Sequence, residues 1–228
     1  MCRTRSAVPV LLLLACASKR TDSTEPPASL TGSQSNDSAR GTERTGAPTI
    51  DPWAGRVVVA GHPAARFKFS IPRGLAPLRG VTPLPAPQTA IELASQGPDG
   101  VGIADGSPTA LNSIVVFSDP AGLGVAFDTL DDTARKKLAS QYVEAMRETI
   151  PDAQAAAVIK VGTHLALRID LPRVVMAGRP MRRGRHYLLF DQAATAAIDC
   201  LWTDAEVARM ASACDAVAAG LARVSLTR

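Results

Sequence analysis

The chain has 228 residues, is 46% hydrophobic but only 4% aromatic, and carries a formal charge of +4 from 25 basic and 21 acidic side chains. A chain of this size can bury one core, which Ala, Val, Leu and Ile must fill because aromatic side chains are few. The near-balanced charge argues against nucleic acid as a partner, and no stretch after residue 16 is long and apolar enough to predict a membrane-spanning helix.

The first fifteen residues are typical of a secretory signal peptide. Arg3 and Arg5 precede an apolar run over residues 7–15, which is too short to span a bilayer. Without those two arginines the charge falls to about +2, with 23 basic against 21 acidic residues. We therefore expect an exported protein.

The apolar run ends in Leu13-Leu14-Ala15-Cys16, which resembles a bacterial lipobox. The resemblance implies that residues 1–15 are removed, and that Cys16 becomes the lipid-modified, palmitate-bearing first residue of a lipoprotein. In such proteins Ala17-Ser18 after the cysteine would favour the outer membrane. A second cleavage remains open, because Ala15-Cys16-Ala17 also fits ordinary signal peptidase, which would release a secreted soluble protein.

Residues 16–50 are predicted to form a flexible tether behind the lipidated cysteine. They consist of Ser, Thr, Pro, Gly and mixed charges with almost nothing apolar, so they cannot offset the entropy of ordering. A coil of this length would hold the following domain roughly 30 Å from the bilayer. Residues 51–228 are then the α/β domain.

The first half of the domain predicts short strands. They are expected at 56–60 and 66–71, separated by Gly61-His62-Pro63. Residues 72–110 are dense in Pro and Gly and predict one short strand at 90–94. A binding loop and a disordered segment are equally compatible with them. The β-branched run at 111–118 predicts a buried strand.

Residues 129–150 predict an amphipathic helix. Asp131 and Asp132 would lie at its positive end, Pro151 would stop it, and Arg135-Lys136-Lys137 would form a solvated face. The apolar positions at helical spacing are Leu130, Ala134, Leu138, Tyr142 and Met146.

The second half of the domain has the clearest patterns. Alternation predicts a half-buried strand at 165–171, and a turn at 178–180 leads into a strand that ends at Phe190. After a reversal at Asp191-Gln192, a third strand is expected at 193–202. Thr203-Asp204-Ala205-Glu206 predicts a capping box at the start of a final helix. The apolar seam of that helix would be Val207, Met210, Cys214, Val217, Leu221 and Val224.

Cys200 and Cys214 are the cysteines that remain for the domain. An even pair in an exported chain predicts a disulfide, with two buried thiols as the alternative. Strand face and helix seam should meet, so the bond would tie helix to sheet and contribute about 3 kcal/mol in the chain-entropy model. Neither cysteine has a Cys or His at zinc-ligand spacing, so no metal site is predicted.

The densest basic stretch contains Arg179, Arg182, Arg183 and Arg185, together with His186. Alternation along a strand sends these residues to both faces. One interpretation is a solvated strand that its charge protects from edge pairing. The other is an anion-binding surface for lipid headgroups or an acidic partner, because the bidentate geometry of arginine suits phosphate.

The order of elements from 57 to 224 resembles the PsbP-like α/β/α fold of photosystem lumenal subunits, a Ran-binding import factor and DcrB-type envelope lipoproteins. The resemblance is carried by residues 67–74 (FKFSIPRG), residues 162–166 (GTHLA) and the closing strand–helix unit. It implies a single α+β domain, an antiparallel sheet with helices packed on it, and an accessory or binding role. No residue role is carried over.

No catalytic, cofactor or phosphate-loop motif is found, and His62, His164 and His186 are scattered, so we predict no enzyme and no cofactor. The preferred hypothesis is a lipid-anchored envelope protein, periplasmic or surface-exposed, with a non-catalytic binding or accessory domain. It would reach the membrane through its lipid and meet an envelope protein or an anionic surface. Two alternatives are a periplasmic or surface hydrolase with a site at 75–111, and a peripheral binder of anionic lipid or polyanion through the arginines at 179–186.

Overall fold

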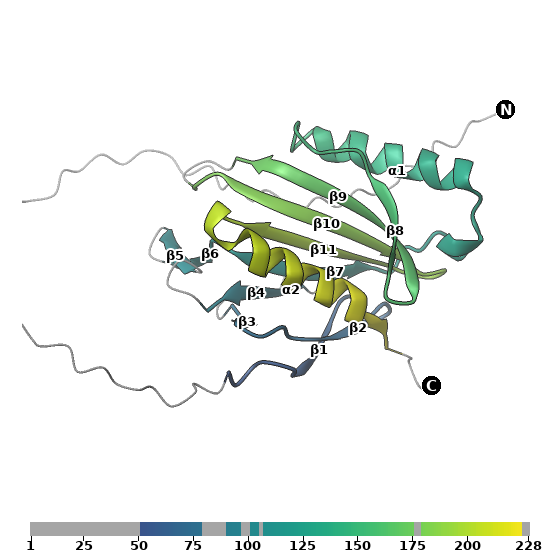
Figure 1. Ribbon diagram of the computed structural model, residues 1–228. Coiled ribbons are helices and arrows are strands. Elements are labelled where there is room, and N and C mark those ends of the chain that lie inside the picture. The colour runs from purple at the N-terminus through teal and green to yellow at the C-terminus, as the bar shows by residue number, and fades with distance from the viewer. Residues whose placement is uncertain (1–50, 79–89, 97–100, 105–106, 176–178, 225–228) are drawn as a thin grey trace, which may run out of the picture. The chain divides into compact units, whose positions relative to one another are not determined.

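The computed structural model describes residues 51–224 except 79–89, 97–100, 105–106 and 176–178, and gives the backbone alone for 101–104 and 107–109. In this part the chain forms a seven-stranded sheet, a three-stranded sheet, a two-stranded ribbon and two α-helices (Figure 1). The α+β class with helices packed on an antiparallel sheet is confirmed. The signal peptide, Cys16 and the tether lie outside the described residues.

The seven-stranded sheet has the order β3-β4-β7-β11-β10-β9-β8, and every neighbouring pair is antiparallel. Its strands are Leu75–Pro77 (β3), Ile91–Ser95 (β4), Ser113–Asp119 (β7), Ala157–Val161 (β8), His164–Val174 (β9), Arg182–Phe190 (β10) and Thr195–Trp202 (β11). Because β10 is hydrogen-bonded on both sides, the interpretation of its arginines as protection of a sheet edge is wrong.

The three-stranded sheet combines strands from both ends of the described chain. β2 (Phe67–Ser70) pairs with β1 (Val57–Ala60) on one side and with β12 (Ala222–Arg223) on the other. β5 (Val101–Ala104) and β6 (Ser107–Ala110) form the ribbon, within the segment where the sequence predicted one short strand. That strand is confirmed as β4.

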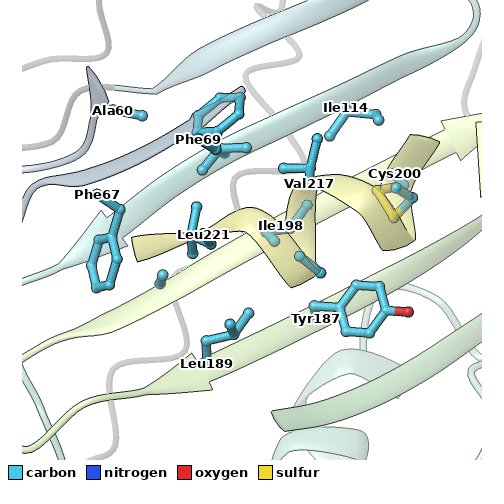
Figure 2. Packing of buried hydrophobic residues seen from close by; sticks show 14 of the residues in the cluster. Ala60, Phe67, Phe69, Ile114, Tyr187, Leu189, Ile198, Cys200, Val217 and Leu221 are labelled. Atoms are coloured by element: carbon cyan, nitrogen blue, oxygen red, sulfur yellow. A yellow bond between two sulfur atoms is a disulfide. The ribbon is translucent and has the colours of Figure 1, made fainter. Parts of the chain in front are cut away.

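Helix α2 (Val207–Gly220) covers one face of the large sheet, here called the α2 face. Its buried residues pack against alternate side chains of β10 and β11, and Phe67 and Phe69 of β2 close the cluster (Figure 2). The predicted seam is confirmed at Met210, Cys214 and Val217, whereas Val207 is exposed. The helix ends at Gly220, so Leu221 and Val224 lie beyond it, although Leu221 is still buried in the core. The apolar side chains of two sheets and one helix thus form a single core.

Helix α1 (Asp132–Arg147) covers the opposite face, the α1 face, where Ala139 packs against the intervening strand residues Leu167 and Leu188. Its buried positions are Ala139, Val143 and Met146. The predicted stripe is thus confirmed at Met146, and its members Leu138 and Tyr142 are partly buried against the same cluster, while Ala139 and Val143 extend the buried face beyond it. The helix also begins later than expected, because a 3-10 turn occupies Phe127–Thr129 and the Asp131 carboxylate accepts the Ala134 N–H at 2.7 Å.

The predicted capping box does not form. The N–H of Thr203 donates to Asn112 Oδ1 at 2.7 Å and its hydroxyl donates to the same oxygen at 3.2 Å, so the side chain is engaged across the fold. A 3-10 turn at Asp204–Glu206 then leads into α2. A partner 91 residues away in the chain has displaced the local cap.

The turn between β8 and β9 packs on the end of α2. Gly162 has φ +57°, and a Cβ at this position would lie 2.7 Å from the carbonyl oxygen of Ala219. Glycine is therefore required here both by its backbone conformation and by the close approach of the helix. This contact brings β8, the last strand of the large sheet, against α2.

Candidate functional site

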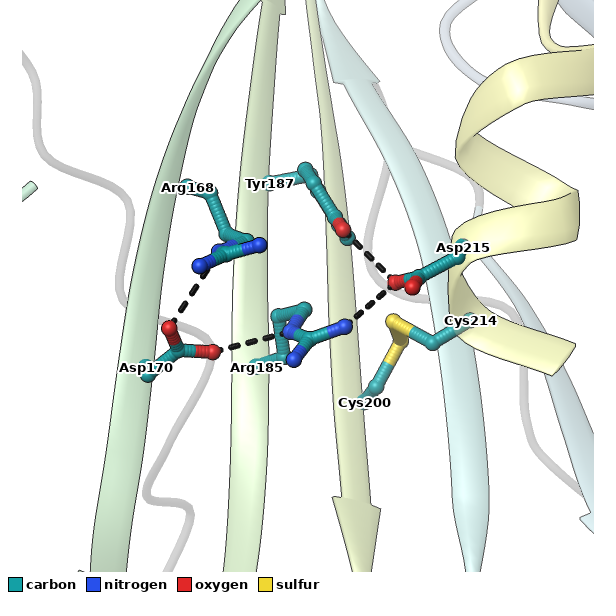
Figure 3. A network of polar contacts seen from close by, with 7 residues as sticks. All are labelled: Arg168, Asp170, Arg185, Tyr187, Cys200, Cys214 and Asp215. Atoms are coloured by element: carbon teal, nitrogen blue, oxygen red, sulfur yellow. Dashed lines mark hydrogen bonds and ion pairs between the residues drawn. A yellow bond between two sulfur atoms is a disulfide. The ribbon is translucent and has the colours of Figure 1, made fainter. Parts of the chain in front are cut away.

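A network of charged side chains joins β9, β10 and α2 on the α2 face (Figure 3). The strand register sets Arg185 opposite Asp170, and Arg185 Nε donates to Asp170 Oδ1 at 2.8 Å. Arg185 Nη1 donates to Asp215 Oδ1 of α2 at 2.5 Å, and the Tyr187 hydroxyl donates to the same oxygen at 2.7 Å. Arg168 Nε lies 3.2 Å from Asp170 Oδ2. The network therefore links two strands to the helix.

The environment of the network raises the pKa of both Arg185 and Tyr187. Burial lowers the pKa of Arg185, but the hydrogen bonds to Asp170 and Asp215 outweigh burial and raise the pKa above its ordinary value. Burial and the hydrogen bond to Asp215 raise the pKa of Tyr187 to about 12. Neither group can exchange protons near neutral pH, so the network is suited to holding the helix in place rather than to acid–base chemistry.

The disulfide lies beside this network. Cys200 of β11 and Cys214 of α2 are joined, with their Cα atoms 6.1 Å apart, and both side chains are fully buried. The predicted pairing of strand with helix is confirmed. Because Asp215 follows Cys214 directly, the covalent bond also fixes the position of the carboxylate that Arg185 and Tyr187 share.

A second polar set crosses the α1 face. The strand registers place Glu92 of β4, Val115 of β7, Asp199 of β11 and His186 of β10 in one row. His186 is buried, and its Nδ1 forms a hydrogen bond with Asp199 Oδ1. Three ionisable groups thus share one row on the face opposite the network, and we call it the polar row.

Arg179 and Arg182, which precede and begin β10, interact electrostatically with Glu92 of the polar row. Burial raises the pKa of Glu92, and the charges of Arg179 and Arg182 partly oppose that shift. Burial and the charge of Arg179 lower the pKa of Arg182, which Glu92 partly offsets. Arg182 is itself buried, as charged groups rarely are unless they are paired. This cation and carboxylate stabilise each other's charged form inside the domain.

A third polar cluster lies at the sheet end where α2 begins. Arg209 of α2 donates to Glu206 Oε2 at 2.7 Å, to the Gly74 carbonyl at 3.2 Å and to the Ser95 hydroxyl. The Gly74 N–H in turn donates to Asp51 Oδ2 at 2.6 Å. Hydrogen bonds from Gly74 and Trp53 lower the pKa of Asp51. The cluster fixes the first described residue of the domain to the start of α2.

The four arginines predicted to form an anion-binding surface do not share one surface. Arg183 and Arg185 point to the α2 face, where Arg183 Nε pairs with Asp204 Oδ1 at 2.6 Å and Arg185 has its two carboxylates. Arg182 lies on the α1 face and is buried, and Arg179 is partly buried near Glu92. The predicted lipidation site, Cys16, lies outside the described residues.

The sequence did not reveal the carboxylates that engage these arginines. Asp170 and Asp215 are 15 and 30 residues from Arg185, and Asp199 is 13 residues from His186. The predicted order of the strands could have revealed one of these pairs, because the antiparallel register of β9 and β10 places Arg185 opposite Asp170. Glu92 is the one ionisable side chain described in the segment where the hydrolase alternative placed its site.

Two further results concern other kinds of site. Among the residues that the structure describes, no three His, Cys, Asp or Glu side chains are grouped so that they could hold a metal ion. In the same part of the chain, no helix has the length and apolar character needed to cross a membrane.

No family model matches the chain, and no curated protein matches it. Similar solved structures include PsbP (CyanoP) of Synechocystis sp. PCC 6803, with 9% identity over 75% of this chain and 94% of that chain and a TM-score of 0.46. They also include LpqN of Mycobacterium tuberculosis, described as involved in cell envelope biogenesis, with 11% identity over 75% of this chain and 91% of that chain and a TM-score of 0.46.

A Bacteroides thetaiotaomicron protein matches with 10% identity and a TM-score of 0.42 over 70% of this chain, and the chain spans 45% of its length. One of these structures is a PsbP protein, and the PsbP-like fold is the one that the sequence resembles. At such identities and scores, these similarities assign neither family nor function to the chain.

Proposed function

We propose that the protein is exported and tethered to the cell envelope through a lipid on Cys16, and that its α+β domain is a non-catalytic binding or accessory module. The observation that carries this proposal is the disulfide between Cys200 and Cys214. Such bonds persist in oxidising compartments outside the cytoplasm. A chain that starts with secretory and lipobox patterns and contains a buried disulfide is consistent with one destination.

The arrangement of charges supports a non-catalytic role. Arg185 is held by two carboxylates, Arg209 by Glu206 and a backbone carbonyl, and His186 by Asp199. These groups stabilise contacts between strands and helices. Catalysis would instead require ionisable groups that are presented to a substrate with pKa values matched to proton transfer.

The test is the intact mass of the mature protein from its native membrane fraction, measured before and after reduction with alkylation. We expect a chain beginning at Cys16 with the added mass of a diacylglyceryl and an acyl group, and alkylation of Cys200 and Cys214 only after reduction. A Cys16→Ser variant is the matched control and should lose the lipid mass. An unmodified chain that begins after Cys16 would contradict the anchor, and alkylation without reduction would contradict the oxidised state.

A further inference from the structure

The hairpin between β9 and β10 exposes two apolar side chains beyond the end of the large sheet. β11 ends at Trp202, opposite Arg183, and β9 ends at Val174, opposite Arg182. The next described residues on the two sides, Val175 and Met181, are 65% and 50% exposed. Single exposed apolar residues are common, but Val175 and Met181 follow and precede the facing ends of two paired strands, and together they form a small apolar end.

Two arginines accompany this apolar end. Arg173 is exposed and Arg179 is partly exposed, and neither belongs to an ion pair in the described part of the chain. Arg183, two residues after Met181, differs because Asp204 neutralises it. We call Arg173, Val175, Arg179 and Met181 the hairpin tip. Arg173 has no carboxylate partner in the described part of the chain, whereas the charge of Arg179 also acts on Glu92. Apolar side chains next to exposed or partly exposed arginines suit the boundary between lipid headgroups and acyl chains.

The hairpin tip also lies at the end of the domain where the preceding chain enters. A series of contacts connects the two places: Asp51 accepts from Gly74, and Gly74 accepts from Arg209. Arg209 pairs with Glu206 in the turn that also contains Asp204, the partner of Arg183. In Figure 1 the end of β9, the beginning of β10 and the start of α2 lie at the same end of the sheet. A lipid attached upstream of Asp51 would therefore be joined to the domain at this end.

We infer that the hairpin tip docks on an anionic phospholipid surface, with Val175 and Met181 entering the headgroup region and Arg173 and Arg179 meeting the phosphates. The inference rests on the proposed lipid anchor and adds an orientation to it. The domain would lie on the membrane with the β9–β10 end inward, and would expose the opposite end to other partners.

The test uses the full chain, exported with its own signal sequence, carrying Val175→Cys labelled with an environment-sensitive maleimide fluorophore. Cys200 and Cys214 are joined and fully buried, and under the proposed anchor Cys2 leaves with the signal peptide and Cys16 carries the lipid, so the cysteine at 175 is the thiol that the label reaches. The matched control is Val125→Cys. Val125 is 45% exposed and follows Gly124, whose N–H donates to Gln192 in the turn at the far end of β10.

Each labelled protein is reconstituted in phosphatidylethanolamine vesicles with and without phosphatidylglycerol, and flotation is measured together with emission. We expect a blue shift and quenching by lipid-borne nitroxide for the label at 175, in the anionic vesicles, and an aqueous signal at 125. Removing Arg173 and Arg179 by substitution with Ser should abolish the difference between the two lipid mixtures.

The possible failures can be told apart. If the protein floats while the label at 175 stays aqueous, docking is refuted and the anchor is retained. If the protein does not float, the anchor is refuted, and the docking is decided by titrating the labelled protein that also carries Cys16→Ser with anionic vesicles. A blue shift produced by higher protein concentration without lipid would assign the surface to a second copy of the chain. A blue shift produced by soluble polyphosphate would assign it to a polyanion, and either result would refute docking on the bilayer.

Discussion

The two faces of the large sheet hold their helices by different means. On the α2 face, a disulfide and a shared carboxylate connect the helix to the strands, in addition to an apolar core. On the α1 face, Ala139 and its neighbours pack on an apolar patch, while the charges of the polar row are engaged among the strands themselves. The comparison indicates that α2 and the sheet form one cooperative unit, from which α1 can separate first.

The largest effect should follow from removal of the covalent link. Replacing Cys200 and Cys214 together by Ala should lower the free energy of unfolding by about 3 kcal/mol, because the unfolded chain regains the freedom of the closed loop. Denaturant unfolding measures the loss, and hydrogen exchange should show that α2 amides lose the protection that distinguishes them from those of α1. Equal protection of the two helices in the oxidised protein would contradict the comparison.

A smaller effect is expected at Arg185. Arg185→Met leaves two carboxylates without their shared cation and should cost about 1–2 kcal/mol. Arg183→Met is the matched control on the same strand and face, because its pair with Asp204 is mostly exposed and should contribute less than about 1 kcal/mol. Urea unfolding of both variants gives the two values. Equal costs would mean that the network does not hold α2 more firmly than a surface ion pair does.

The smallest effects, but with opposite signs, should come from pH. Asp51, on the α2 side, has a lowered pKa. Its contribution to the free energy of unfolding is therefore present above the ordinary value of 3.8 and is lost as the pH falls below it. Glu92, on the α1 face, has a raised pKa, so its contribution is complete below the ordinary value of 4.5 and is lost as the pH rises.

Unfolding of Asp51→Asn and Glu92→Gln between about pH 3 and pH 7 measures both contributions. Relative to the unmodified protein, the free energy of unfolding of Asp51→Asn should rise as the pH falls. That of Glu92→Gln should rise as the pH rises. Parallel pH profiles for the two variants would show that the two carboxylates do not differ in environment.

Local patterns predicted those parts of the fold in which local chemistry decides the outcome. The alternation in β9 and the spacing of Met210, Cys214 and Val217 identified a strand, a helix and the disulfide that joins α2 to β11. β12 has two residues, and its pairing depends on β2, so no periodicity could reveal it. The capping box was predicted wrongly for the same reason. Thr203 donates instead to Asn112, which is distant in the sequence.

The charged sites were less predictable for a physical reason. A basic run in the sequence shows cations, but not the carboxylates that the fold brings to them. The partners of Arg185 could be identified only from the register of β9, which provides Asp170, and from the position of α2, which provides Asp215. The prediction that the arginines alternate between faces was correct, and the hairpin tip could be separated from them only after Arg183 and Arg185 had been assigned their carboxylates.

The pairing of β12 with β2 has a consequence for biosynthesis. Lys68 and Phe67 meet Ala222 and Arg223, so the three-stranded sheet cannot be completed until nearly the whole domain has been made. Leu221, which is buried in the core beside Phe67, comes from the same late segment. A partly synthesised chain lacks this strand and this core residue, so it stays short of its stable state. A ribosome-bound chain that stops before Leu221 should remain sensitive to protease, the condition in which a polypeptide can still be threaded through a membrane.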